Sequence, residues 1–449
     1  MSESELSRRV DAAMPTTLEE LAQIVAIPSV SSDPARQEDL HRSAELVSQL
    51  LERLGLDARI CSATAADGTP GKPAVLATRH VSDTAPTVLL YAHHDVQPTG
   101  DIELWSHPTF ALTEDNGRLY GRGSADDGAG IVVHLGALRA LGDKLPVNVV
   151  VFIEGEEEIG SPSFQAFLDR YREQLAADVI IVADSNNWDE ETPALTASLR
   201  GVTSVEVTIR VLEHAVHSGM FGGPILDAVT LASRLIATLH DNDGSVAVRG
   251  LGGSGDADVD WNEDAFRADA SVVPGYQLAG KGDLASRVWN QPALSVIGFD
   301  ARSVAEASNT IAAACTFKLS LRTVPGTDPA AAQAALIQHL EENRPFGAQM
   351  TITADEVGPG YQADLDTPTA AKLRESLAAA WGKAPVNIGV GGSIPFIADF
   401  QRAFPNAEVL VTGVEDPRSN AHSEDESVAV SMLRNAIVAE AQFLRDLGE

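Results

Sequence analysis

Four continuous apolar runs, each followed directly by acidic or histidine residues, constrain the fold of this chain most strongly. The runs lie in residues 87–96, 147–157, 178–186 and 407–414. Their Val, Ile and Leu residues are consecutive, which is the pattern of strands covered on both faces. Segments with a helical pattern lie between or after them, near 128–141, 161–175, 368–381 and 430–446. The sequence therefore predicts an α/β fold, a doubly wound domain with a mostly parallel sheet.

The segment between about 200 and 356 has a different pattern. Strand-like segments at 203–211 and 316–324 alternate apolar with polar residues, which indicates a sheet with one solvated face. The remaining helices and strands, which complete a βαββαβ order, are predicted at 224–241, 293–299, 328–342 and 348–354. This order predicts a ferredoxin-like α+β domain with an antiparallel sheet. We expect it to be inserted at 201–356 into a first domain formed by 1–200 and 357–449.

The N-terminal segment carries a helix-start signal at Thr17. Thr17 followed by Glu20 forms a capping box, in which the two side chains accept backbone N–H groups of the first helical turn. An apolar periodicity through residues 18–25 follows it. We therefore expect the first helix to begin at Thr17 and to end before IPSVSSDP.

Charge and composition exclude several classes of partner. The 449 residues carry a formal net charge of −32, which would repel nucleic acid and anionic membranes. The two cysteines, Cys61 and Cys315, form no CxxC pair, which is typical of a reducing compartment. No segment reaches the ~18 apolar residues of a membrane span, and the N-terminus has no signal-peptide core. We expect a cytoplasmic protein with no nucleic-acid or membrane partner.

The first acidic and histidine cluster is HHD at 93–95. In an extended strand His93 and Asp95 share a face, while His94 points the other way. An imidazole ligand that is oriented by a nearby carboxylate is a common arrangement around metals. Taken alone, His93 could equally be a core histidine and Asp95 a strand cap.

The second cluster is a pair of aspartates in the Gly-rich segment GRGSADDGAG, just before a predicted helix. Asp126 or Asp127 could simply be the helix N-cap. The same place also suits a carboxylate that bridges two metals. Both interpretations hold together if Asp127 caps the helix and Asp126 ligates.

The remaining clusters follow the second, third and fourth apolar runs. Adjacent glutamates at 156–158 resist joint ionisation unless a cation is present or a proton is shared. A metal would relieve this for one of them and leave another as a general base. Asp184 also follows a strand, where the binding crevices of open α/β sheets lie. His422 lies in the polar segment RSNAHSEDE and would mean little by itself.

Together these residues form a mixture of ligands that suits paired metal ions. Two histidines with three or four carboxylates can bind Zn²⁺ or Mn²⁺. Two such ions can polarise a carbonyl and activate a water together. The sequence therefore favours a metal-dependent enzyme.

Seven segments make the chain similar to the co-catalytic di-zinc exopeptidase superfamily of carnosinases, nonspecific cytosolic dipeptidases, aminoacylases and succinyl-diaminopimelate desuccinylase. In chain order they are IPSVS, YAHHDVQP, LYGRGSADDGAG, IEGEEEIGS, HSGMFGG, GGSIP and AHSEDE. HHDVQP, EGEEEIGS and HSGMFGG resemble the dipeptidase branch more than the desuccinylase. The resemblance implies a catalytic α/β domain with an inserted lid and dimerisation domain.

The resemblance also implies a ligand for each position of a two-metal site. His93 and Asp184 would bind one ion, Glu158 and His422 would bind the other, and Asp126 would bridge them. We expect Zn²⁺ at both positions, with Mn²⁺ as the alternative.

Further residues are implied to act on the substrate and the reaction. Glu157 would be the general base, and Asp95 would orient His93. His217 of HSGMFGG would reach the active site of a partner subunit and stabilise the oxyanion. Arg322 and the GGSIP turn, with Gly392 and Ser393, would hold the substrate carboxylate; the residues alone fit an exposed arginine and an ordinary turn equally well.

The predicted function is that of a homodimeric metallo-dipeptidase, with the dimer formed through the inserted domain. Its substrates would be small dipeptides with a free C-terminal carboxylate. An N-acyl-amino-acid amidohydrolase with the same site is the alternative enzyme. A homologue that binds metal or peptide without catalysis is the alternative from another class, and the retained Glu157 argues against it.

Overall fold

The chain forms two compact units. The computed structural model describes residues 1–392 and 395–448. Unit 1 contains Met1–Ala197, Ala363–Ile388 and Phe396–Glu449, and unit 2 contains Ser198–Gln362 and Gly389–Pro395. Most of unit 2 is therefore one insertion in the sequence of unit 1.

A six-stranded mixed sheet lies at the centre of unit 1, in the order β1-β2-β6-β3-β7-β17. Its strands are β1 (Asp57–Cys61), β2 (Ala74–Arg79), β3 (Thr87–His93), β6 (Asn148–Glu154), β7 (Val179–Val182) and β17 (Glu408–Val411). β3 pairs in parallel with β6 and β7, and β7 pairs in parallel with β17. Near one edge of the sheet, β2 is antiparallel to both of its neighbours, β1 and β6. The four apolar runs are thus four adjacent parallel strands, which confirms the predicted fold class.

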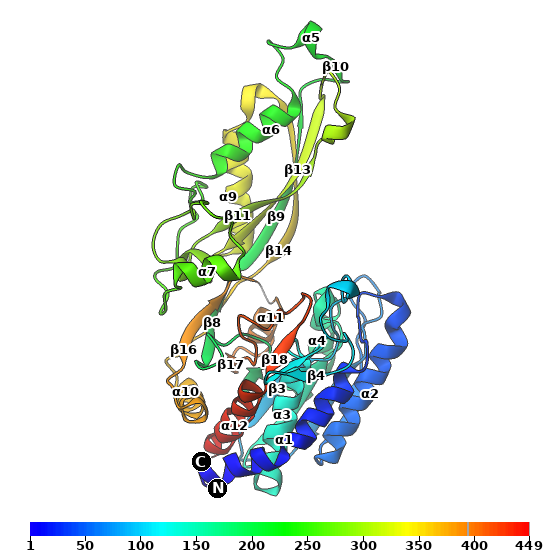
Figure 1. Cartoon of the computed structure of the whole chain (residues 1–449), viewed down its shortest axis with the longest axis vertical. Helices are drawn as coiled ribbons and strands as arrows, with labels where there is room; N and C mark the ends of the chain where they lie inside the picture. The colour runs from blue at the N-terminus through cyan, green and yellow to red at the C-terminus, as the bar shows by residue number, and fades with distance from the viewer. Residues whose placement is uncertain (393–394, 449) are drawn as a thin grey trace. The chain divides into compact units, whose positions relative to one another are not determined.

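Helices pack around this sheet. They are α1 (Glu3–Val25), α2 (Gln37–Arg53), α3 (Gly128–Leu141), α4 (Phe164–Leu175), α10 (Pro368–Trp381), α11 (Pro395–Ala403) and α12 (Val430–Leu447). α3 lies between β3 and the helices α1 and α12 (Figure 1). This position explains why every residue of α3 except Arg139 is buried. Within the described ranges, no helix has the length and apolar character needed to cross a membrane.

The first helix begins earlier than predicted. α1 starts at Glu3 and is capped by Ser2, whose side chain accepts the N–H of Glu5, while Thr17 is buried inside the helix. Leu6 and Val10 belong to the same core cluster as the later residues of the helix. Their burial extends the helix through Pro15, although an interior proline disfavours a helix by about 3 kcal/mol. The capping box at Thr17 was therefore a wrong start signal.

A small antiparallel sheet holds two loops of unit 1 together. β4 (Thr113–Asp115), β5 (Arg118–Tyr120) and β18 (Ser427–Ala429) pair in the order β18-β5-β4. The loop at 121–127 leaves β5, and the loop at 412–426 leads into β18. Because Tyr120 is paired with Ser427, these two loops meet at one place. A further sheet, β15 (Tyr361–Gln362), β8 (Ala194–Leu199) and β16 (Val386–Val390), includes residues where the chain passes between the units.

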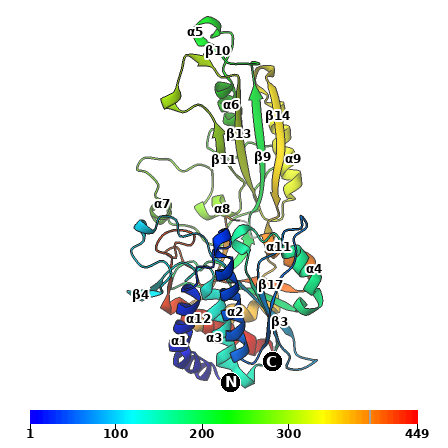
Figure 2. The same ribbon diagram turned by 90° about the vertical axis from the view of Figure 1, so that its right-hand side faces the viewer.

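Unit 2 is built on an antiparallel sheet in the order β11-β13-β9-β14 (Figure 2). The elements that form its βαββαβ order are β9 (Gly201–Arg210), α6 (Ala228–Ile236), β11 (Ala293–Asp300), β13 (Ala314–Thr323), α9 (Pro329–Glu342) and β14 (Gln349–Gly358). β13 alternates buried with half-buried residues, as its sequence pattern predicts. Shorter elements are β10 (Val216–His217), α5 (Ser218–Phe221), α7 (Glu263–Asp269), α8 (Leu284–Trp289) and β12 (Thr310–Ile311). The predicted antiparallel α+β domain is confirmed.

A buried ion pair lies between α3 and α12. His134 Nδ1 is 2.9 Å from both carboxylate oxygens of Glu440, and its Nε2 is 3.0 Å from the carbonyl oxygen of Tyr91. Burial acts to lower the pKa of His134, but the Glu440 carboxylate outweighs it, so the pKa lies above its usual value of 6.5. The protonated imidazole is therefore favoured in the folded protein.

We expect this pair to stabilise the protein more at low pH than at high pH. Its contribution is fully present below the unfolded pKa of about 6.5 and is lost as the pH rises through the higher folded pKa of His134. A His134→Gln variant should lose about 2 kcal/mol at pH 6 and less at pH 9. Urea unfolding of both proteins from pH 6 to pH 9 measures this difference. A difference that does not change with pH would contradict the assignment.

Candidate metal centre

The carboxyl ends of the parallel strands bring acidic and histidine residues to one edge of the unit 1 sheet. His93 is the last residue of β3 and is paired with Glu154, the last residue of β6. Glu157 and Glu158 follow β6 in a short 3-10 helix. Asp184 follows β7, which is parallel to β3. Parallel pairing therefore gathers residues that lie about 90 positions apart in the sequence.

His93, Asp126 and Asp184 form a first group of potential ligands. One donor atom from each lies within 4.8 Å of the others. His93 Nε2 is 3.0 Å from Asp126 Oδ1 and 3.9 Å from Asp184 Oδ2. This nitrogen is buried, and among the described residues it makes no hydrogen bond of acceptable geometry. A buried nitrogen that faces two carboxylates without such a bond fits a metal ligand.

Asp126, Glu158 and His422 form a second group within the same 4.8 Å limit. His422 Nε2 is 2.9 Å from Asp126 Oδ2 and 3.1 Å from Glu158 Oε2. Asp126 belongs to both groups and presents a different oxygen to each histidine. The donors therefore fit two divalent ions that share the Asp126 carboxylate.

The backbone of Asp95 orients His93. His93 Nδ1 lies 3.0 Å from the carbonyl oxygen of Asp95, and 3.5 Å from its carboxylate oxygen Oδ1. A carbonyl oxygen only accepts, so the imidazole proton lies on Nδ1 and the lone pair of the neutral ring lies on Nε2. The Asp95 carboxylate accepts the backbone N–H groups of Glu157 and Glu158, each at 3.1 Å. Asp95 thus also holds the turn that carries these two glutamates.

Asp126 and Asp127 have different environments although they are adjacent. Asp127 caps α3 by accepting the N–H of Gly130 at 3.1 Å. Its other oxygen accepts the N–H of His93 at 3.2 Å, which ties the start of α3 to the end of β3. The peptide bond between Asp126 and Asp127 is cis. The Asp126 carboxylate is directed to the two histidines instead.

The glutamates of EGEEE also separate into two kinds. Glu154 accepts the hydroxyl of Tyr91 at 2.7 Å, and Glu156 accepts the N–H of Ser163 at 2.7 Å. A Cβ at Gly155 would lie 2.2 Å from the carbonyl oxygen of Pro73, so only glycine fits there. Glu154 and Glu156 are therefore structural, and only Glu157 and Glu158 face the donor groups.

Burial and mutual repulsion raise the pKa values of most carboxyl groups at this edge. Burial raises the pKa of Asp184 to about 7, and the charges of Asp126 and Glu158 add to the effect. The pKa of Glu158 is raised by burial and by Asp126. Burial acts in the same direction on Asp126, but the nearby imidazoles outweigh it and hold its pKa well below the usual range. A divalent cation would favour the charged form of all three groups.

Glu157 lies beside both donor groups and belongs to neither. Its Oε2 is 4.0 Å from His93 Nε2, and its side chain is 21% exposed. Burial raises the pKa of Glu157, and the charges of Asp184 and Asp126 raise it further against the opposing effect of His93. A carboxylate of raised pKa next to metal donors and partly open to solvent can act as a general base.

Glu415 is an acidic residue near this edge that the sequence reading did not select. It is half-buried. Burial raises its pKa, and the charges of Asp126 and Asp184 raise it further. A signal for it was present, because Glu415 directly follows the fourth apolar run in the same way that Asp184 follows the third.

The residues expected to contact substrate lie in unit 2. Arg322 is on β13, and His217 is exposed at the N-cap of α5, where Nδ1 accepts the N–H of Gly219 at 3.0 Å. Gly392 lies in the described chain, whereas Ser393 lies outside the described residues.

Arg200 is a neighbour of Arg322 that the sequence reading missed. Burial lowers the pKa of Arg200 to about 10, and the charge of Arg322 contributes to the shift. Its Nε donates to the carbonyl oxygen of Gly391 at 3.1 Å. Two guanidinium groups therefore share one region of unit 2 with the Gly391–Gly392 turn. Arg200 ends the segment SLR before an alternating strand, and nothing in that local pattern marks it as functional.

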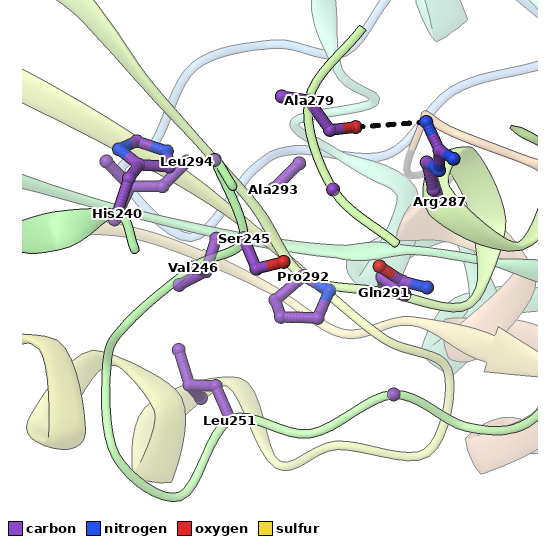
Figure 3. Close-up of a pocket in the computed structure, with 13 residues that line it drawn as sticks. His240, Ser245, Val246, Leu251, Ala279, Arg287, Gln291, Pro292, Ala293 and Leu294 are labelled. Atoms are coloured by element: carbon purple, nitrogen blue, oxygen red, sulfur yellow. Dashed lines mark hydrogen bonds between the residues drawn. The ribbon is translucent and has the colours of Figure 1, made fainter. Parts of the chain in front are cut away.

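Unit 2 also contains a pocket of about 440 Å³ that includes none of the predicted site residues (Figure 3). Two of its polar side chains, those of Arg287 and Gln291, are already engaged. Arg287 donates to the carbonyl oxygens of Ala279 and Gly282, and Gln291 donates to that of Lys281. Most of the other lining residues are apolar or glycine. The pocket therefore offers few polar groups with which to select a ligand.

Known proteins match this chain over most of its length. The family described as Peptidase family M20/M25/M40 matches residues 89–446. The cysteinylglycine-S-conjugate dipeptidase of Corynebacterium striatum is 32% identical over 96% of this chain and 95% of its own length. The Cys-Gly metallodipeptidase of Candida albicans is 28% identical over 98% of this chain and 96% of its own length. The structure of human carnosine dipeptidase 1 has the same fold, with a TM-score of 0.81 and 24% identity over 100% of this chain and 99% of that one.

We expect divalent metal to stabilise the protein, because a cation relieves the repulsion among these carboxylates. At a free Zn²⁺ or Mn²⁺ concentration 100 times the dissociation constant, one site adds about 2.7 kcal/mol. Thermal unfolding of the chelated protein, with and without added metal, measures the shift. In the Asp126→Asn control, which weakens the shared donor, the shift should be much smaller. An equal shift in both proteins would contradict binding at these groups.

Proposed function

The chain belongs to peptidase family M20/M25/M40, and from that premise we propose that it is a metallo-dipeptidase. Its substrates would be dipeptides with a free C-terminal carboxylate. The observation that carries the proposal is the pair of donor groups that share Asp126 beside Glu157. The dipeptidases that resemble this chain over nearly their whole length support the substrate class.

Five residues would hold the metals. His93 and Asp184 would bind one ion, Glu158 and His422 the other, and Asp126 both. When bound, the two ions would polarise the scissile carbonyl and lower the pKa of water. We propose Zn²⁺ at both positions. Mn²⁺ is the alternative, because carboxylates outnumber histidines in the donor set and carboxylates suit Mn²⁺.

Glu157 would move the proton. Its carboxylate takes a proton from the attacking water and returns it to the nitrogen of the leaving amine. The raised pKa of Glu157 favours this role, because it makes the ionised carboxylate a stronger base. Asp95 holds the turn that presents Glu157 and Glu158 by accepting both backbone N–H groups. Two adjacent glutamates can therefore perform two different tasks.

Arg322 would bind the carboxylate of the substrate, together with Gly392 and Ser393. Arginine is suited to this because its planar fork can donate two parallel hydrogen bonds. The nearby charge of Arg200 would add to the attraction for an anion. Arg200 also supports the Gly391–Gly392 turn through its bond to the carbonyl oxygen of Gly391.

An N-acyl-amino-acid amidohydrolase remains the alternative enzyme. Both reactions release an amino acid with a free carboxylate, so Arg322 would serve either one. The dipeptide differs by its free ammonium group. The acidic edge around Asp184 and Glu415 would attract that ammonium, which favours the dipeptide.

We expect the metal-loaded protein to hydrolyse an unblocked dipeptide such as Ala-Gly at least tenfold faster than its N-acetyl-amino-acid analogue. A Glu157→Gln variant should lose about 10²- to 10⁴-fold in kcat, because the proton acceptor is removed. Amine release, measured with both substrates and both proteins, tests the proposal.

A Glu173→Gln variant is a suitable control, because Glu173 is exposed on α4 and belongs to neither donor group. It should retain full activity on the dipeptide. Preference for the N-acetyl substrate would favour the amidohydrolase. Full turnover in Glu157→Gln would overturn the proposed base.

We also propose that the protein is a homodimer formed through the inserted domain. β11 is an edge strand of the unit 2 sheet, and its apolar residues Val296, Ile297 and Phe299 are exposed. Edge strands with exposed apolar residues readily pair with another chain. His217 is suited to act across this interface. Its Nδ1 accepts the backbone N–H of Gly219. The neutral ring therefore carries its proton on Nε2, where it can donate to an oxyanion.

We expect His217→Ala and Glu157→Gln to complement each other when the two inactive proteins are mixed. Half of the randomly exchanged dimers are mixed and have one intact site, so activity should recover to roughly a quarter of that of the wild type. The assay is dipeptide hydrolysis after subunit exchange, with dimer formation checked by sedimentation. Mixed dimers that stay inactive would argue against donation of His217 across subunits.

A further inference from the structure

We infer that Glu426 and Arg122 are positioning residues for the second donor group, and that they set its affinity for a divalent cation. The inference rests on the proposed function, because it takes Asp126, Glu158 and His422 to hold a metal. Neither Glu426 nor Arg122 belongs to a donor group. Both lie in the two loops that β5 and β18 bring together.

The Glu426 carboxylate is fully buried and accepts four N–H groups from the loop that carries Asp126. Its Oε2 accepts Arg122 Nη1 at 2.6 Å and the backbone N–H of Gly123 at 3.1 Å. Its Oε1 accepts the backbone N–H groups of Ala125 at 2.9 Å and Asp126 at 3.0 Å. One carboxylate therefore fixes the path of the backbone directly up to the shared ligand.

Arg122 extends this contact to the loop that carries His422. Its Nη2 donates to the carbonyl oxygen of Ser423 at 3.1 Å and to that of Pro98 at 3.2 Å. The guanidinium lies over the ring of Trp105, 5.3 Å from its centre. Because Ser423 directly follows His422, the guanidinium restrains the backbone beside this ligand.

His422 depends on such a restraint more than the other histidine does. The His93 backbone belongs to the pairing of β3 with β6, and its ring is buried. The side chain of His422 is 57% exposed, and its backbone has a φ of 63° in the left-handed region. Its place opposite Asp126 is therefore set by the loop. Loss of the Glu426–Arg122 pair should affect the second donor group more than the first.

A purely stabilising role explains these contacts less well. A buried ion pair often contributes no more stability than apolar residues of the same size. Glu426 instead orders successive backbone N–H groups beside one ligand, and Arg122 holds a carbonyl beside another. Residues that orient ligands in this way typically change metal affinity by about 10- to 100-fold when they are replaced.

The test is Zn²⁺ binding to the full chain. Metal is first removed with a chelator, and Zn²⁺ is then titrated in competition with a chromophoric chelator to obtain two dissociation constants. Glu426→Gln keeps the side-chain volume but turns an NH₂ group toward N–H donors. We expect about a 10- to 100-fold weaker constant for one Zn²⁺ and a smaller loss for the other, because Asp126 is shared by both donor groups.

Two further variants separate positioning from stability. Glu20→Gln removes a comparably buried carboxylate that pairs with Arg139, at a place that does not contact either donor group. It should leave both Zn²⁺ constants within about threefold of wild type. Arg122→Lys keeps the charge but loses the fork that reaches Pro98 and Ser423, so it should weaken one constant less than Glu426→Gln does. This milder variant provides the measurement if Glu426→Gln does not fold.

Folded Glu426→Gln and Arg122→Lys proteins that bind two Zn²⁺ ions with wild-type constants would overturn the inference. Equal weakening in Glu20→Gln would also overturn it, because general destabilisation would then explain the effect. A wild-type protein that binds no Zn²⁺ would remove the proposed function as well. If the wild type binds two ions but does not hydrolyse dipeptides, only the proposed activity fails, since the binding constants still decide the role of Glu426 and Arg122.

Discussion

Repulsion among the buried carboxylates at the edge of the unit 1 sheet is the constraint on which the rest of this site depends. Asp126, Glu158 and Asp184 contribute to two donor groups that share Asp126, and Glu157 lies beside them. Burial acts to raise the pKa of all four carboxyl groups, and only at Asp126 do the two imidazoles outweigh it. Such a cluster is held together only by groups that oppose the negative charge. Two imidazoles do so here, and two divalent cations would complete the compensation.

A second set of acidic residues surrounds the first and accepts the backbone N–H groups of the segments that carry it. Asp95 accepts two from the turn that carries Glu157 and Glu158. Asp127 accepts one from His93, and Glu426 accepts three from the loop that carries Asp126. Acidic residues therefore have two roles in this chain. Some face the proposed metal positions, and others bind the backbone that presents them.

Much of the fold could be predicted because it depends on local pattern. The consecutive apolar residues of β3, β6, β7 and β17 marked buried parallel strands, and the alternation in β13 marked a sheet with one solvated face. The prediction failed at the start of α1, which was placed at the capping box of Thr17 although the helix begins at Glu3. Burial of Leu6 and Val10 against the core extends the helix through Pro15, and no local signal reports it.

An apolar run and the acid that follows it are adjacent in the chain, so local pattern was enough to show which strands end in potential ligands. What each acid does depends on the folded chain. Glu157 and Glu158, or Asp126 and Asp127, are neighbours in sequence, and their tasks differ because their side chains point to different partners. The role of Glu426 could not be predicted for the same reason. Its carboxylate accepts backbone N–H groups that lie about 300 residues away in the chain and are brought close by the pairing of β5 with β18.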